Sequence, residues 1–154
     1  MKLLDTSKRL GNTKSRKTNR DESIRMATLT MHPDNVVCAG AKAAGCMVDC
    51  LKESGLGGVY PSINQARQAR TDYWHNSKIT FLDQLCRELE NFSRLCAKQR
   101  VQGVVRLNVM SDISWEDYDV PQSFPELQFY DYTKKARRFH GQRQPDNYRL
   151  MFSY

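Results

Sequence analysis

The sequence predicts an α/β fold with a mostly parallel sheet, and three observations lead to this prediction. Strand patterns alternate with helical patterns, two of the helices are long, and the fourth strand pattern ends close to the last residue. A long helix between two strands forms a crossover connection, which joins parallel strands. Four strands are too few to close an eight-stranded barrel.

The first strand is expected over residues 24–31, where apolar and polar residues alternate with the period of a strand. His32 and Pro33 end this pattern. Residues 36–58 hold three cysteines among glycines and alanines, and they predict a loop that wraps around a bound group.

Two helices follow the loop. Residues 61–75 begin with a proline at a first-turn position, and residues 78–100 carry an apolar stripe at three- and four-residue steps. Cys86 lies on this stripe, so we expect it in the core. The stripe residues are Phe81, Leu82, Leu85, Leu89, Phe92 and Leu95.

Three more strands are predicted over residues 104–109, 127–132 and 148–153. A helical turn is expected at Trp115–Tyr118. Residues 134–147 form a basic loop, whose Lys134, Lys135, Arg137 and Arg138 indicate either a solvated surface or a contact with a polyanion.

The length of 154 residues is that of one domain, so we expect a single α/β domain over residues 1–154. Within it, residues 1–22 form a basic N-terminal arm. Residues 1–25 carry eight Lys or Arg against three Asp or Glu, which is most of the net charge of +7. Such an arm either stays solvated or meets a polyanion such as nucleic acid.

The sequence shows no apolar run of about 20 residues, which is the length that crosses a bilayer. Its N-terminal apolar stretch is too short for a signal peptide. We therefore expect a soluble, cytoplasmic protein without a membrane partner.

Cys38, Cys46 and Cys50 are the clearest candidate ligands, with the spacing C-x7-C-x3-C. Thiolates bind iron, zinc and copper(I) well, and in the absence of a secretory signal a disulfide is not expected. The spacing is that of neither a zinc finger nor a common ferredoxin. A zinc ion would need a fourth ligand, for which His32 is the nearest histidine. The alternative is three unrelated small core residues.

These cysteines and the later strand motifs resemble a bacteriophage family known as Gene product 88. The order of the shared pieces matches over nearly the whole chain. Two positions depart from the family pattern, since Asn108 stands where members tend to have His and Ser111 where they tend to have Gly. The matching pieces are Gly11-Asn12-Thr13-Lys14, Cys38-Ala39-Gly40-Ala41, Cys46, Cys50, Tyr60-Pro61-Ser62, Arg67, Arg70, Val105-Arg106-Leu107-Asn108, Ser111-Asp112, Phe129–Lys134 and Tyr148-Arg149-Leu150.

The resemblance implies a phage protein of the host cytoplasm with a [4Fe–4S] cluster in a barrel-like fold, here a partial or minimal TIM-barrel-like form, and a possible hydrolytic activity. Cys38, Cys46 and Cys50 would then hold the cluster, with His32 a candidate fourth ligand and zinc the alternative metal. An open iron would act as a Lewis acid, Asp112 would orient or deprotonate a water, and Arg106 and Lys134 would hold a small anionic or ester substrate.

Two other functions stay open. One is nucleic-acid binding through residues 1–25 and 134–149, with the metal or cluster as a structural element. The other is electron transfer or redox sensing. Since the chain is shorter at its C-terminus than other members of the family, it is either a minimal form or it completes its sheet as a homodimer.

Overall fold

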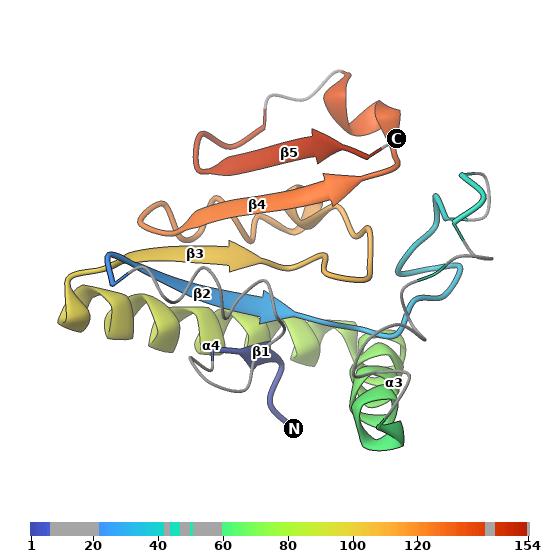
Figure 1. The fold of residues 1–154 in the computed structure, drawn as a ribbon, viewed down its shortest axis with the longest axis horizontal. Helices are drawn as coiled ribbons and strands as arrows, with labels where there is room; N and C mark the ends of the chain where they lie inside the picture. Colours follow the sequence, from blue (N-terminus) through green and yellow to red (C-terminus); the bar gives the residue numbers. More distant parts are fainter. Residues whose placement is uncertain (7–21, 42–43, 47–49, 51–59, 141–143, 154) are drawn as a thin grey trace.

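The computed structural model describes residues 1–6, 22–41, 44–46, 50, 60–140 and 144–153. They form a five-stranded sheet in the order β1-β2-β3-β4-β5, flanked by two long helices (Figure 1). β2, β3, β4 and β5 run parallel to one another, and β1 runs antiparallel to β2. The α/β class and the mostly parallel sheet are thus confirmed.

The described residues form no closed barrel, because their sheet is open, with β1 at one edge and β5 at the other. The four parallel strands follow one another in chain order, as they do in a barrel. A TIM barrel needs eight strands to bring its first and last strands together. Two predictions fall largely outside the described residues. The basic arm includes residues 7–21, and the cysteine-bearing loop includes residues 42–43, 47–49 and 51–59.

The predicted elements agree with the observed ones to within a few residues. Two elements were not predicted, the short strand β1 and the 3-10 turn η3. The observed bounds are β1 Leu4–Asp5, β2 Ile24–Leu29, α3 Pro61–Asn76, α4 Lys78–Gln99, β3 Gln102–Arg106, η2 Trp115–Tyr118, β4 Gln128–Thr133, η3 Ala136–Phe139 and β5 Tyr148–Phe152. No helix among the described residues is long and apolar enough to cross a membrane.

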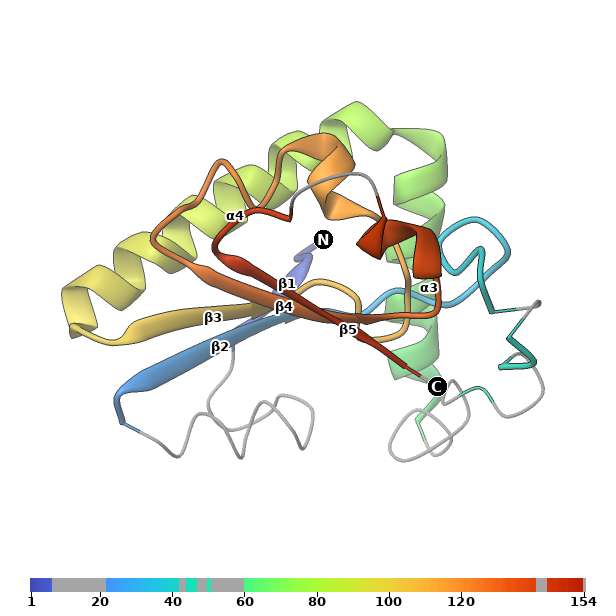
Figure 2. The same cartoon turned by 90° about the horizontal axis from the view of Figure 1, so that it is seen from above.

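The described helical parts of the connections between the parallel strands, α4, η2 and η3, lie on one side of the sheet (Figure 2). This follows from the right-handed rule for crossovers, since successive strands added in one direction place each crossover on the same face. The core forms between this covered face and the connections. Its largest fully buried side chains include Trp115, Tyr148, Phe81 and Phe129.

The apolar stripe of α4 packs on the sheet as its periodicity predicts. Its buried residues are Phe81, Leu85, Leu89, Phe92 and Cys96. Cys86, expected in the core, is only partly buried and packs against the core from its margin. The fully buried cysteine is Cys96, which lies two helical turns after Leu89 on the same face.

β1 is held by a side chain of α4. The Glu88 carboxylate accepts hydrogen bonds from the backbone N–H of Leu3, at 3.0 and 3.1 Å, and of Leu4, at 2.7 Å. A two-residue strand makes few ladder bonds, so these charge-assisted bonds stabilise its position beside β2.

Gly103 marks the place where β3 approaches both α4 and the segment before β4. A Cβ added there would lie 2.5 Å from Cδ2 of Leu127 and 3.1 Å from Sγ of Cys96. Since overpacking a dense core forces neighbouring side chains to move, we expect Gly103→Ala to lower the free energy of unfolding by about 1–3 kcal/mol. Urea denaturation measures this change.

Gly40→Ala is the matched control, because its added Cβ would meet Lys134 Cβ at 3.4 Å, an ordinary contact distance. The control should change the unfolding midpoint little. Equal destabilisation by the two substitutions would contradict the tight packing inferred at Gly103.

Candidate functional site

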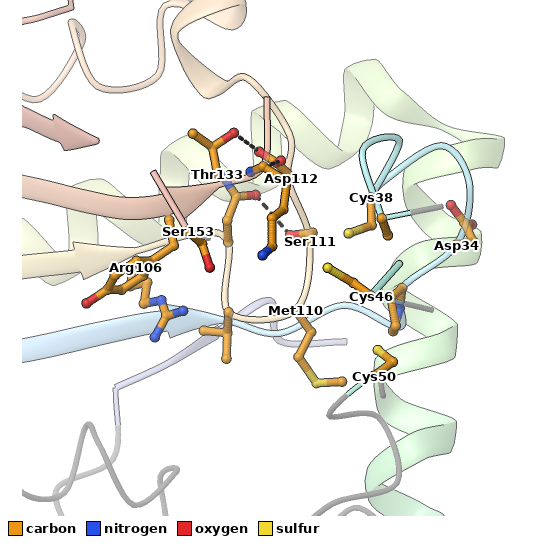
Figure 3. A pocket seen from close by; sticks show the side chains of 16 residues that line it. Asp34, Cys38, Cys46, Cys50, Arg106, Met110, Ser111, Asp112, Thr133 and Ser153 are labelled. Carbon is orange, nitrogen blue, oxygen red and sulfur yellow. Dashed lines mark hydrogen bonds between the residues drawn. The ribbon is translucent and has the colours of Figure 1, made fainter. Parts of the chain in front are cut away.

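A cavity of about 280 Å³ lies at the carboxyl edge of the parallel strands. Parallel strands bring the segments that follow them to the same edge, where α/β proteins commonly place their sites. The cysteine-bearing segment comes after β2 and closes the cavity on the side away from the sheet (Figures 1 and 3). The cavity is lined by Pro33, Asp34, Cys38, Ala41, Cys46, Cys50, Arg106, Asn108, Val109, Met110, Ser111, Asp112, Tyr132, Thr133, Lys134 and Ser153.

The three predicted cysteine ligands line this one cavity. Cys38, Cys46 and Cys50 lie in a row on the cysteine-bearing segment, across from Arg106 on the sheet, with Met110 and Ser111 between them (Figure 3). All three are unpaired and partly exposed. The structure therefore brings together thiols that the sequence separates by up to 12 residues.

Turns hold the beginning of this segment in place. The Asp34 carboxylate accepts hydrogen bonds from the backbone N–H of Val36 at 2.8 Å and of Val37 at 2.9 Å, and its other oxygen lies 2.7 Å from Nε2 of His75 on α3. Burial raises the pKa of Asp34, but these hydrogen bonds outweigh burial and hold its pKa below the ordinary value. The carboxylate thus fixes the backbone that leads into Cys38.

The Cys38 thiol is the most strongly perturbed of the three. Burial raises its pKa to about 11, and the negative charges of Asp112, Cys50 and Cys46 raise it further, while Lys135 acts in the opposite direction. The thiols are therefore close enough to influence one another. A metal that binds here must displace a proton that Cys38 holds at neutral pH.

Asp112 lies on the floor of the cavity and is 3% exposed. Its carboxylate accepts hydrogen bonds from Thr133 Oγ1 at 2.7 Å, Lys134 N at 3.0 Å and Arg138 Nη1 at 3.0 Å. The Lys135 ammonium donates to the Asp112 carbonyl oxygen. These contacts hold the end of β4 against the segment that follows β3, so Asp112 positions the cavity wall.

Arg138 is a buried cation that joins this floor to η2. It forms a paired contact with the Glu116 carboxylate, at 2.8 and 2.6 Å, in addition to its bond with Asp112. Burial lowers the pKa of Arg138, but the Glu116 carboxylate and Tyr148 outweigh burial and raise the pKa above its ordinary value. The interpretation of Arg138 as part of a solvated surface was wrong, since its side chain is buried and paired with Asp112 and Glu116.

A second buried group centres on Asn108, directly after β3. Its side-chain oxygen accepts hydrogen bonds from Ser111, Ile113 and Trp115, and its amide nitrogen donates to the Ile113 carbonyl at 2.9 Å. Its backbone N–H donates to Asp131 at 2.8 Å. Asn108 therefore shapes the loop 108–113 that lines the cavity.

Arg106 and Lys134 both line the cavity, as the anion-binding prediction requires. The Arg106 guanidinium lies 5.0 Å from the ring centroid of Tyr132, and its buried Nε has no hydrogen-bond partner in the described part of the chain. Lys134 is held through its backbone N–H, which donates to Asp112. Their roles toward a substrate stay predictions.

His32, the candidate fourth ligand, does not line this cavity. Its backbone N–H donates to the Arg67 carbonyl and its carbonyl accepts from Thr71 Oγ1, which tie it to α3. Asp34, two residues later, is the carboxylate that lines the cavity beside the cysteines. Sequence reasoning missed it because Asp34 reads as a turn residue after Pro33.

No three Cys, His, Asp or Glu side chains in the described part of the chain form a group that could hold a single metal ion. A structural zinc ion needs four ligands at about 2.0–2.3 Å from the metal, so a zinc site would contain such a group of side chains. An iron–sulfur cluster distributes its thiolates over several irons, and the row of cysteines on one cavity wall fits that donor set better.

The stability of the site depends on pH through Asp131, which is buried and accepts hydrogen bonds from Asn108 and Tyr148. Burial raises its pKa to about 7, and those hydrogen bonds oppose the rise. The folded protein thus holds a proton that the unfolded chain releases near pH 4. We expect the free energy of unfolding, relative to Asp131→Asn, to fall by a few kcal/mol from pH 4 to 7.

Chemical denaturation at pH 5 and pH 8 measures this difference, with Asp117→Asn as an exposed control. The control should follow the wild type at both values. A wild type whose stability relative to Asp131→Asn does not change with pH would mean that Asp131 is already ionised in the folded protein.

Comparison with known proteins gives one match. No curated protein and no solved structure matches the chain. The model of one family, Gene product 88, matches residues 1–154, the same family that the motifs resemble. Since this match covers every residue, the chain belongs to the Gene product 88 family.

Proposed function

We propose that the protein binds a [4Fe–4S] cluster through Cys38, Cys46 and Cys50, and that the rest of the cavity receives a small anionic ester. The observation that carries the proposal is that these three thiols line one cavity with the residues that follow β3 and β4. A cubane held by three protein thiolates leaves one iron open to a further ligand, and such an iron supplies Lewis-acid chemistry.

The charges around the cavity suit a cluster with thiolate ligands. Lys135 lies near enough to Cys38 to lower the pKa of its thiol, and Arg106 and Lys134 line the same cavity. Cationic groups offset the negative charge that three thiolates and inorganic sulfide bring into a partly buried site. They support cluster binding independently of the cysteine spacing.

The same cations give the cavity its substrate preference. Arg106 presents a planar guanidinium that can hold a carboxylate or phosphate in a paired contact, and Lys134 adds a compact charge. The hydroxyls of Ser111 and Ser153 line the wall between them. An acyl group with an anionic end would be held by Arg106 while its ester faces the cysteine row.

Asp112 contributes by position in this proposal. Its three accepted hydrogen bonds hold Thr133 and the Lys134 backbone at the cavity wall. Because the oxygens of Asp112 accept hydrogen bonds from Thr133, Lys134 and Arg138, its carboxylate holds these three residues in place. Its role as the base that deprotonates a water stays a prediction.

The cluster is tested first by anaerobic purification with iron and acid-labile sulfide analysis and a visible spectrum. We expect about four iron and four sulfide per chain, and loss of both in Cys46→Ala. Cys86→Ala is the matched control, because Cys86 lies on α4 away from the cavity, and it should keep the full content. A content of one zinc per chain and no sulfide would contradict the cluster and indicate a zinc site instead.

The substrate class is tested with two 4-nitrophenyl esters, one with a carboxylate at the far end of the acyl chain and one neutral. We expect Arg106→Gln to lower kcat/KM for the anionic ester about tenfold or more, because a charge-assisted hydrogen bond is lost. The neutral ester should be affected little. Arg94→Gln, on the exposed face of α4, is the control. An equal loss of kcat/KM for both esters would show that Arg106 does not bind the anionic end of the substrate.

A further inference from the structure

The two faces of the sheet differ in what covers them. Side chains alternate between faces along each strand, and the face toward α4 carries the core. None of the described helices or 3-10 turns lies on the other side beneath β4 and β5 (Figure 2). We call the positions of β3–β5 on that side the open face, which consists of Val104, Arg106, Gln128, Tyr130, Tyr132, Arg149 and Met151.

The open face carries aromatic rings beside arginines. The Arg106 guanidinium lies 5.0 Å from the ring centroid of Tyr132 and 6.0 Å from that of Tyr130. The register places Arg149 beside Tyr130 and Met151 beside Tyr132 on the neighbouring strand. Tyr132 is 40% exposed and Met151 is 38% exposed.

The charge of this face has a single sign. On β3, β4 and β5 its only charged residues are Arg106 and Arg149, whereas Asp131 points to the covered face, where it is fully buried. The buried Nε of Arg106 has no hydrogen-bond partner among the described residues. Two arginines and two tyrosines without a carboxylate among them form a surface complementary to a polyanion with flat rings.

We propose that the open face binds single-stranded nucleic acid. Bases would stack on the exposed ring of Tyr132 and on Tyr130, while phosphates would meet Arg149 and Arg106, as on other sheet surfaces that bind single strands. In a duplex the bases stack on one another and cannot stack on the tyrosines. A duplex could therefore contact only the arginines, through its phosphates. This goes beyond the proposed cluster site and does not depend on it.

A second copy of the chain suits this face less well. A two-fold dimer would place the same patch against itself, which brings the arginines of both copies together without a carboxylate to neutralise them. The open face also differs from the basic loop at residues 134–147, where Arg138 is buried against Asp112 and Glu116 and cannot reach a phosphate.

The experiment is fluorescence anisotropy of a labelled poly-dT strand of about 12 nucleotides, with the corresponding RNA strand and a DNA duplex of the same length, on the full chain. We expect the single strands to bind more tightly than the duplex. Tyr132→Ala should weaken binding about tenfold or more, and Tyr132→Phe should restore it, because the ring and not the hydroxyl stacks.

The charge is tested with a matched pair. Arg149→Gln should weaken binding and reduce the dependence of affinity on salt by about one phosphate contact. Arg94→Gln removes an equally exposed arginine from α4, so it should leave the affinity and the salt dependence close to those of the wild type. Arg149 does not line the cavity, so this substitution leaves the lining of the ester site unchanged.

Several results would overturn the proposal. These are no binding of either single strand at low salt, duplex binding as tight as single-strand binding, or Tyr132→Ala and Arg149→Gln with the same affinity as Arg94→Gln. A dimer in light scattering that Tyr132→Ala converts to a monomer, with unchanged nucleic-acid affinity, would instead make the open face a self-association surface.

Discussion

The buried guanidinium of Arg138 is the contact on which the site depends. It reaches Glu116 in the connection after β3, Asp112 on the cavity floor and the Tyr148 hydroxyl at the start of β5. A buried charge is tolerated only when its partners replace the water it has lost. Without this cation, the carboxylates of Asp112 and Glu116 would lose the positive charge that they share. The walls that follow β3 and β4 would then lose the common partner that holds them together.

The topology places the cavity and the open face on the same strands. Because β2 to β5 follow in chain order, the ends of the strands meet at one edge, and none of the described helices lies on the opposite face of β4 and β5. In a closed barrel that face would become the interior. In this open sheet it keeps exposed tyrosines and arginines instead. Arg106 and Tyr132 belong to both features, since they line the cavity and also lie on the open face.

Local pattern was enough to predict the long elements, and long-range contacts explain what it missed. The stripe of α4 and the apolar runs of β3 and β4 are periodic over several residues, so their types could be predicted. β1 has two residues and depends on Glu88, more than 80 residues away. The burial of Arg138 could not be predicted for the same reason. A basic run is normally solvated, and the acidic partners of Arg138 lie 22 and 26 residues earlier in the sequence. The shared cavity of the cysteines was predictable in outline, and Asp34 beside them was not.

Asn108 shows why the chemistry of the cavity must come from other residues. The family resemblance leads one to expect histidine here, yet the asparagine oxygen accepts three hydrogen bonds and its amide nitrogen donates two, to Ile113 and Asp131. A neutral imidazole offers one donor and one acceptor, so it could not replace these bonds. An amide also does not ionise near neutral pH, so it cannot serve as a general acid or base. In this chain the position is a structural one, and the cavity-lining groups that could transfer a proton or bind a ligand are the thiols, the Lys134 ammonium and the carboxylates of Asp34 and Asp112.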